Sequence, residues 1–501
     1  MRCKYIFGVV VPAMVLASTV ATSVSAFSLN RLGGTQVEGG AEISAFDADS
    51  ANLFVTTGDT IEIFNLSNPS TPTFVSSIDL TKSSNIGGFE SGSVNSVAFS
   101  NGVLVAAIEA DVAQDNGIVA FFDAQGNFQQ KFEVGALPDM VTFTPNGDKV
   151  LVANEGEPSD DYTVDPVGSV SIINIANNTV KTVGFDNVPI DPEVRIFGSG
   201  ASPSEDLEPE FITVSADGST AYVTLQENNA IGILDLYTER FTEVKSLGFK
   251  DHSIIGNNFD ASNEDGGINI QTRPVLGMYQ PDAISSYTVN GDTYLVTANE
   301  GDARDYEGFS EEERVKDLVL DPFAYPNAAA LQRENNLGRL KTTSALGDTD
   351  GDGDIDQIYS YGARSFSIWD AAGNLVFDSG DDFEQIIANN FPELFNINGG
   401  EVNELDDRSD DKGPEAEGVA LGVFRGHTLA FIGLERTGGV MVYDISNPAA
   451  PTFVTYEPNF SSDYSPEGLL YIDADNSPIG APLLVVTNEV SKTFAVYQAT
   501  P

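Results

Sequence analysis

The chain has 501 residues, of which 75 are acidic and 24 basic, giving a formal net charge of −51 at pH 7. So acidic a surface argues against nucleic acid and anionic lipid as partners, and favours divalent cations or basic partners. Because 41% of the residues are hydrophobic, we expect a globular protein rather than an acidic disordered chain.

The first 26 residues have the order of parts of a secretory signal peptide. Two basic residues come first, the apolar stretch YIFGVVVPAMVLA follows, and Val-Ser-Ala fits the small-residue rule for cleavage after Ala26. The single cysteine, Cys3, lies inside this segment, so the predicted mature chain, 27–501, has no thiol or disulfide. Since no second long apolar run appears, we expect a secreted or periplasmic protein without a membrane span. We also expect a monomer.

Seven segments of the mature chain repeat one pattern. An alternating strand meets a turn built on Asn-Gly, Asp-Gly or a similar pair, and a second apolar strand, a polar loop and a third strand follow. The segments begin at residues 41, 94, 137, 208, 280, 415 and 465. The junctions FNLSNPSTPTFV (64–75) and YDISNPAAPTFV (443–454) are nearly the same, and a fourth strand is expected after each third strand.

Seven four-stranded units with little helical periodicity predict an all-β, single-domain, seven-bladed β-propeller of the YVTN/WD40-like kind. A two-sheet sandwich is the alternative, but it does not account for seven similar units. The seventh unit ends after its third strand, so the segment FSLNRLGGTQV (27–37) is expected to supply the missing strand and close the ring. The wide spacing after the fifth unit predicts insertions in that blade, at about 302–360 and 381–414.

The sharpest local motif is GDTDGDGDIDQIY, in which five aspartates alternate with other residues: Asp348, Asp350, Asp352, Asp354 and Asp356. In a tight loop this spacing turns several carboxylate oxygens toward one hard cation, and Ca²⁺ fits best. Gly353 would allow the sharp bend. Tyr359 stands where an EF-hand has its bidentate Glu, so we predict a calcium loop in a β context. The alternative is a solvated acidic turn.

Acidic residues also recur at equivalent places in the repeats. One set stands near the start of the first strand, with Asn95 as the exception: Glu42, Asp139, Glu210, Asp282, Glu417 and Glu467. A second set follows the second strand: Glu109, Glu155, Gln226 or Glu227, Glu300, Glu435 and Glu489. Because the first strand of a propeller blade lines the central channel, each set is expected to form a ring that binds cations, takes up protons or pairs with bases. The alternative is a purely structural set of acids that fixes backbone or arginine partners between blades.

Five basic residues lie near these acids in the sequence and are candidates for binding an anion such as phosphate: Arg304, Arg364, Arg408, Lys412 and Arg436. His252 and His427 have no neighbours at zinc-ligand spacing, which argues against a zinc hydrolase. A Gly-x-Ser-x-Gly elbow is also missing from the sequence.

Several longer phrases resemble the choice-of-anchor I family: LPDMVTFTPNGDKVLVANEGEPSDDYTVDPVGSVSI, GARSFSIWD, RSDDKGPEAEGVA and AFIGLERTGGVMVYDI. The resemblance covers almost the whole mature chain. It implies a secreted or surface propeller. The family includes cell-surface glycoproteins linked to biomineralisation and bacterial exported proteins labelled alkaline phosphatase.

The first functional hypothesis is a secreted calcium-binding propeller that acts as a cell-surface, matrix or mineral-associated binding module. The alternative is a calcium-dependent, alkaline phosphatase-like phosphomonoesterase. In that case Glu155, Glu300 and Glu417 are the candidate catalytic carboxylates and the five basic residues hold the phosphate ester. A protein-binding scaffold that uses the insertions is a third possibility. The binding module stands first, because no nucleophile or general base stands out.

Overall fold

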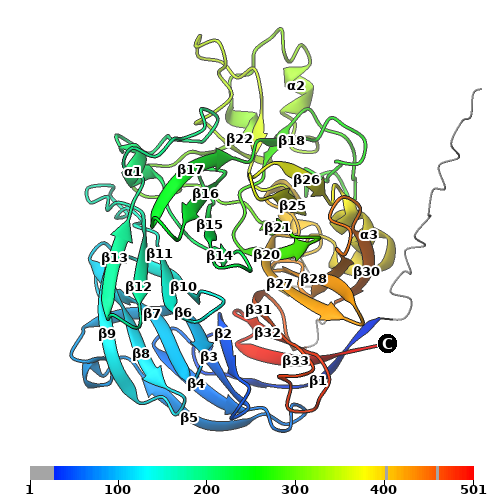
Figure 1. The fold of residues 1–501 in the computed structure, drawn as a ribbon. Helices are drawn as coiled ribbons and strands as arrows, with labels where there is room; N and C mark the ends of the chain where they lie inside the picture. The colour runs from blue at the N-terminus through cyan, green and yellow to red at the C-terminus, as the bar shows by residue number, and fades with distance from the viewer. Residues whose placement is uncertain (1–26, 401–403, 459–461) are drawn as a thin grey trace, which may run out of the picture.

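The computed structural model describes residues 27–400, 404–458 and 462–501, and Figure 1 shows sheets arranged around a common centre. The predicted signal peptide lies outside the described residues. Within them, seven sheets have four strands and one has five, and helices are few and short. The predicted all-β class is therefore confirmed.

The four-stranded sheets follow one another along the chain, and the first three lie in its N-terminal part. The first contains β2 (Ser44–Asp47), β3 (Asn52–Thr56), β4 (Thr60–Asn65) and β5 (Thr73–Asp79). The second contains β6 (Ser91–Ser100), β7 (Val103–Ala110), β8 (Asn116–Asp123) and β9 (Phe128–Ala136). The third contains β10 (Pro138–Phe143), β11 (Lys149–Asn154), β12 (Ser169–Asn174) and β13 (Thr179–Val183).

The remaining four sheets of this kind continue the series. The fourth contains β14 (Ile212–Val214), β15 (Thr220–Leu225), β16 (Ala230–Asp235) and β17 (Arg240–Ser246). The fifth contains β20 (Ile284–Val289), β21 (Asp292–Asn299), β25 (Ser365–Asp370) and β26 (Leu375–Asp378). The sixth contains β27 (Ala416–Phe424), β28 (His427–Leu434), β29 (Val440–Asp444) and β30 (Thr452–Glu457). The seventh contains β31 (Pro466–Ile472), β32 (Leu483–Asn488), β33 (Thr493–Thr500) and β1 (Ser28–Gln36).

The N-terminal strand completes the last sheet, as predicted from the sequence. β1 pairs with β33 in antiparallel register, from Ser28 opposite Thr500 to Gln36 opposite Thr493. The first strands of successive sheets lie beside one another around the centre in Figure 1, and the contacts run β2–β6–β10–β14–β20–β27–β31 and back to β2. The pairing of the two chain ends therefore covers an edge that would otherwise be open to another strand.

Local sequence accounts for the strands and turns. The second strand of a sheet is packed on both faces by neighbouring sheets, and Leu53 to Thr56 of β3 are all buried. The fourth strand lies at the rim, and Phe74 and Val75 of β5 are exposed. In the predicted Asn-Gly turn between β6 and β7, Asn101 has φ 50° and Gly102 has φ 80°, which are the left-handed values that this two-residue hairpin turn requires.

A five-stranded sheet was not expected from the sequence. It consists of β18 (Phe249–Asp251), β19 (Leu276–Met278), β24 (Tyr359–Ser360), β23 (Lys341–Thr343) and β22 (Glu312–Arg314). It joins a segment that precedes the fifth four-stranded sheet to the predicted 302–360 insertion, and it has its own buried cluster that includes Phe259, Val275 and Ile358. In Figure 1 this sheet projects beyond the ring. Strands of two or three residues carry too little periodicity to be read from sequence.

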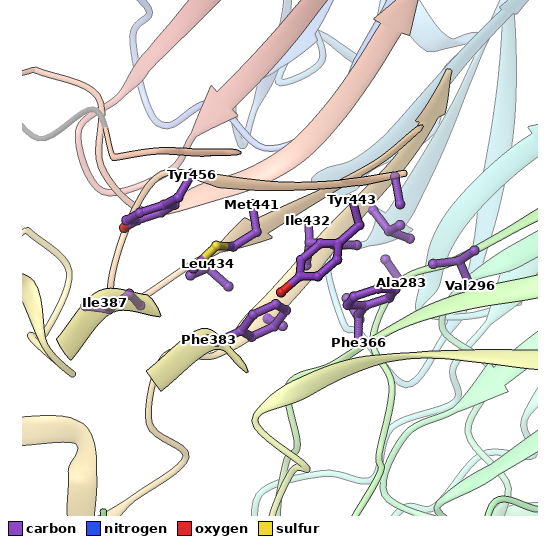
Figure 2. Close-up of a cluster of buried hydrophobic side chains, with 14 of the residues drawn as sticks. Ala283, Val296, Phe366, Phe383, Ile387, Ile432, Leu434, Met441, Tyr443 and Tyr456 are labelled. Carbon is purple, nitrogen blue, oxygen red and sulfur yellow. The ribbon is translucent and has the colours of Figure 1, made fainter. Parts of the chain in front are cut away.

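The helices are concentrated in the connections. The α-helices are α1 (Pro203–Asp206), α2 (Ala328–Leu331) and α3 (Asp382–Asn390), and the 3₁₀ helices are η1 (Ser83–Ile86), η2 (Val315–Asp317), η3 (Pro392–Leu394) and η4 (Asp407–Asp410). Figure 2 shows Phe383 and Ile387 of α3 packed against side chains of the fifth and sixth sheets. The rings of Phe366 and Tyr443 lie 4.6 Å apart there. The second predicted insertion, 381–414, therefore contributes to the core. No helix among the described residues is long and apolar enough to span a membrane.

Candidate cation-binding sites

The aspartate-rich loop folds around the carboxylate of Asp348. Its Oδ1 accepts a hydrogen bond from the backbone N–H of Gly351 at 2.7 Å, and its Oδ2 accepts one from the N–H of Gly353 at 3.0 Å. Gly353 has φ 99°, so the glycine at the predicted bend adopts a conformation that other residues rarely reach. The carboxylate of Asp356 accepts hydrogen bonds from both the N–H and the hydroxyl of Thr349.

Two groups of three carboxylates meet at this loop and share Asp356. Oxygens of Asp348, Asp350 and Asp356 lie within 4.8 Å of one another, and so do oxygens of Asp321, Asp354 and Asp356. Four of the five predicted ligands therefore take part, whereas Asp352 belongs to neither group.

Asp321 was missed by the sequence analysis. A parallel bridge between Leu320 and Ile355 brings its segment to the loop, and the N–H of Ile355 donates to the carbonyl of Val319 at 2.7 Å. Such a contact between distant segments leaves no local pattern in the sequence. An acidic residue just after the apolar run LVL was the only available hint.

The loop carries uncompensated negative charge. Partial burial, followed by the charges of Asp352 and Asp321, raises the pKa of Asp354 to about 6. The neighbouring charge of Asp352 is the main cause that raises the pKa of Asp350. No lysine or arginine within the described ranges forms an ion pair with either group of three. A bound divalent cation would remove this repulsion, because hard cations prefer carboxylate oxygens.

A cavity of about 900 Å³ runs along the first strands of the four-stranded sheets. At one end it is lined by four of the acids predicted from the repeats: Glu42, Asp139, Asp282 and Glu467. Its wall includes half-buried apolar side chains, namely Phe99, Met140, Phe211, Leu469 and Tyr471. At the other end it reaches the hairpin turns that carry Asp47, Asp49 and Asp473.

The acids at the inner end of this cavity form one electrostatic group. Burial, with the charges of Glu157 and Glu109, raises the pKa of Asp139 to about 7, and burial also raises that of Glu467 to about 7. Burial, followed by Glu300 and Glu467, raises the pKa of Asp282 well above its usual range.

Further predicted acids adjoin this group. Burial is the main cause that raises the pKa of Glu155, Glu210 and Glu417, and the second cause in each case is a neighbouring glutamate. Glu489, by contrast, is exposed. Burial is the main cause that raises the pKa of Glu42 to about 7, and the charge of Glu489 is the second cause.

Several of these carboxylates have one oxygen without a hydrogen-bond partner in the described structure. Oε2 of Glu210, Glu227 and Glu417 is buried without a hydrogen-bond partner in the described part of the chain. Each of these three residues is less than 10% exposed. Burying a charged oxygen without compensation is costly, so these atoms would gain from a cation or a proton.

A second part of the acidic ring is paired with bases. Lys412 Nζ lies 2.5 Å from Oε1 of Glu300 and 3.1 Å from Oε2 of Glu415. Arg408 Nη2 is 2.6 Å from Oε1 of Glu415, and Arg436 Nη2 is 3.1 Å from Oε1 of Glu435. Oxygens of Glu300, Glu415 and Glu435 also lie within 4.8 Å of one another. Here the lysine and two arginines supply the positive charge.

Burial and neighbouring charges shift the pKa values of both Glu300 and Lys412. It raises the pKa of Glu300, an effect that Lys412 partly offsets. Burial alone would lower the pKa of Lys412, but Glu300 and Glu415 outweigh it and raise that pKa well above its usual range. The ammonium therefore stays charged between the two carboxylates. Glu415 was missed by the sequence analysis, and its left-handed φ of 54° shows that the backbone bends sharply to place it.

The other two predicted anion-binding residues lie outside this group. Arg304 is buried and pairs with Asp206 and, at 2.8 Å, with Oε2 of Glu208. Arg364 Nη1 lies 2.7 Å from Glu384, and its Nη2 donates to two backbone carbonyls in the segment around η4. All five predicted anion-binding residues are thus engaged with carboxylates of the protein.

Antiparallel sheets arranged around an acid-lined central cavity define a β-propeller-type protein. A model of the choice-of-anchor I domain matches residues 42–448, so the chain belongs to that family, as its sequence phrases predicted.

Known proteins show more limited similarity. The mesenchyme-specific cell surface glycoprotein of Strongylocentrotus purpuratus is 30% identical over 295 residues, which are 51% of this chain and 36% of that protein. Gigasin-3a of Magallana gigas is 30% identical over 189 residues, which are 34% of this chain and 66% of that protein. The chain therefore spans less than two thirds of either relative. Among solved structures, Kuenenia stuttgartiensis hydrazine synthase has a TM-score of 0.49 and 12% identity, with 93% of this chain and 97% of that chain covered.

Proposed function

We propose that this protein is an extracellular binding module of the cell surface or matrix, built as a seven-bladed propeller and stabilised by Ca²⁺ in the loop from Asp348 to Asp356. The family and the cell-surface relative support the location. The seven blades correspond to the seven four-stranded sheets, whose first strands contact one another in a closed series. The convergence of the loop aspartates carries the calcium assignment.

The calcium assignment is supported by both ligand type and position. All the converging groups are carboxylates, which Ca²⁺ prefers, and flexible loops with alternating aspartates suit its irregular coordination. Asp321 belongs to a different segment from the other four ligands, so a shared ion would tie the two segments of the 302–360 insertion together. Calcium would therefore stabilise the inserted sheet and the surface that it presents.

A calcium titration tests this proposal. Isothermal titration calorimetry should show saturable Ca²⁺ binding that the double variant Asp348→Asn, Asp350→Asn abolishes. Because a ligand that binds only the folded state stabilises it, calcium at a hundredfold excess over Kd should add about 2.7 kcal/mol to the free energy of unfolding. Thermal melting in Ca²⁺ and in chelator should differ for the wild type and coincide for the variant.

The matched control is the double variant Asp111→Asn, Asp115→Asn. It removes the same two charges from an exposed loop between β7 and β8. It should bind and respond to calcium like the wild type. A wild-type melting curve that is identical in calcium and in chelator would refute the calcium assignment.

The phosphomonoesterase alternative receives less support from the geometry. A phosphate site needs cationic donors that are free to face the ester. Arg408, Lys412 and Arg436 instead face Glu300, Glu415 and Glu435. The binding module is therefore the function that we propose.

A further inference from the structure

The central cavity is a separate feature from the calcium loop. We propose that it binds an organic cation, namely ammonium groups carried on an aliphatic chain, as in a linear polyamine. This goes beyond the proposed function and does not depend on calcium in the loop.

The negative charge of the acidic ring is only partly compensated by basic residues. Within the described ranges, Asp139, Glu210, Asp282, Glu417 and Glu467 form no ion pair with a lysine or arginine, whereas Glu300 and Glu435 in the same ring do. The protein thus neutralises one part of the ring with its own bases and, within those ranges, leaves the other part without a basic partner. Asp139, Asp282 and Glu467 of that part line the cavity. A deficit of positive charge at a cavity wall favours a cationic ligand.

Two buried carboxylate oxygens of the acidic ring are left without a hydrogen-bond partner in the described structure. Oε2 of Glu417 and Oε2 of Glu210 are buried and have no hydrogen-bond partner among the described residues. Glu417 precedes Gly418 and Val419, which line the cavity. Its strongest electrostatic neighbour is Glu467, which also lines the cavity. An ammonium group is a suitable partner for such oxygens, because it supplies three donors together with a positive charge.

The spacing of these acids favours an organic cation over a metal ion. In the described structure, three groups of three carboxylates have oxygens within 4.8 Å of one another. None of these groups contains Asp139, Glu210, Asp282, Glu417 or Glu467. No compact coordination shell is thus preformed at this end of the cavity. The volume of about 900 Å³ and the apolar side chains of Met140, Phe211 and Leu469 instead suit a ligand with a hydrocarbon body.

The length of the cavity suits an extended aliphatic chain. From Glu42 through β2 to Asp47, the chain advances about 16 Å if each residue contributes roughly 3.3 Å. Carboxylates lie at both ends of this path: Glu42 and Asp139 at one end, and Asp47 and Asp473 at the turns. An aliphatic chain with ammonium groups at both ends could therefore meet acids at each end and apolar side chains between them.

Calorimetry with spermidine tests the proposal on the full chain. The wild type should show one saturable site. The double variant Glu417→Gln, Glu467→Gln should bind about tenfold more weakly or worse, because it removes the carboxylate of Glu467, which lines the cavity, and that of its electrostatic neighbour Glu417. The surface variant Asp111→Asn, Asp115→Asn removes two charges elsewhere and should bind like the wild type. This control separates a built site from general attraction to an acidic protein.

Substitutions at Asn95 provide a test that removes no acid. Asn95 lines the cavity at the position where the other repeats carry the ring acids. Asn95→Asp should tighten spermidine binding several-fold, and Asn95→Lys, which tethers an ammonium there, should abolish it. Circular dichroism checks the fold of each variant. If the double glutamine variant does not fold, the opposite effects of the two Asn95 variants decide the question.

Two measurements that involve calcium distinguish the cavity from the loop of Asp348 to Asp356. Spermidine affinity should be unchanged in Asp348→Asn, Asp350→Asn, and CaCl₂ should not displace spermidine from the wild type beyond the effect of matched ionic strength. Three results would overturn the proposal: no saturable spermidine binding, equal binding in the surface and cavity variants, or specific displacement by calcium. Loss of calcium binding alone would count against the calcium loop and not against the cavity.

Discussion

Asp321 and Asp356 meet at one candidate cation site although they belong to distant segments of the chain. Their carboxylate oxygens lie within 4.8 Å of each other and of an oxygen of Asp354. The parallel bridge between Leu320 and Ile355 sets this approach. This bridge therefore ties the aspartate-rich loop to the segment that carries Asp321 in the same insertion.

The substitution Asp321→Asn should weaken calcium binding about tenfold, because it removes the charge of one ligand while keeping its shape. Melting in saturating calcium should fall, while melting in chelator should stay the same or rise slightly as repulsion is relieved. The control Asp317→Asn alters an exposed residue of the same insertion and should change neither quantity. Equal calcium affinity in the two variants would remove Asp321 from the site.

Lys412 should contribute strongly to stability. Lys412→Met leaves Glu300 and Glu415 facing each other without the buried ammonium, and breaking a buried pair in this way costs about 3–5 kcal/mol. Lys316→Met, which removes an exposed pair with Glu334, should cost about 1 kcal/mol or less. Urea unfolding measures both. A loss in Lys412→Met no greater than that in Lys316→Met would contradict the assigned role.

The repeated strands could be predicted from sequence because each carries its own period and turn. Asn101 and Gly102 illustrate this: the pair fixes a hairpin wherever it falls between two apolar runs. The meeting of Asp139 and Asp282 at one cavity follows from the same repetition, since equivalent positions in related sheets face the same centre. Local pattern and approximate symmetry together carry this part of the prediction.

The insertions could not be predicted in the same way. Lys412 reaches Glu300, and Glu415 gathers Arg408 and Arg436, only because the segment before the sixth sheet folds back over the ring. The same long-range folding creates the five-stranded sheet from strands of two or three residues. The pairing of some acids with bases, and the exposure of others to the cavity, therefore depends on contacts between distant segments. No short stretch of sequence contains such contacts.

Stability should fall as the pH rises from about 4.5 to about 7. Glu42, Asp139 and Glu467 have pKa values of about 7 in the folded protein, against 4.5 for an ordinary Glu and 3.8 for an ordinary Asp. In this window the folded state binds more protons than the unfolded state, so the free energy of unfolding decreases by up to about 1.4 kcal/mol per pH unit for each group. Urea unfolding at pH 5 and pH 7.5 in chelator measures the change.

Glu467→Gln should flatten this dependence, since the neutral amide has no proton to lose. Glu313→Gln, at an exposed position, should leave the slope as it is in the wild type. Spermidine should restore more stability at pH 8 than at pH 5, because the cavity acids are mostly ionised at pH 8 and mostly protonated at pH 5. A wild-type stability that rises steadily through this window would be incompatible with the raised pKa values.

The binding-module proposal predicts no specific phosphatase activity. With p-nitrophenyl phosphate in saturating calcium, the wild type should release nitrophenol no faster than the double variant Glu300→Gln, Glu417→Gln. The physical reason is that Lys412 and Arg408, the cations nearest to these acids, are held by Glu300 and Glu415 and cannot face an ester without breaking buried ion pairs. Turnover that requires calcium and is lost in the double variant would instead establish the phosphomonoesterase and displace the purely binding function.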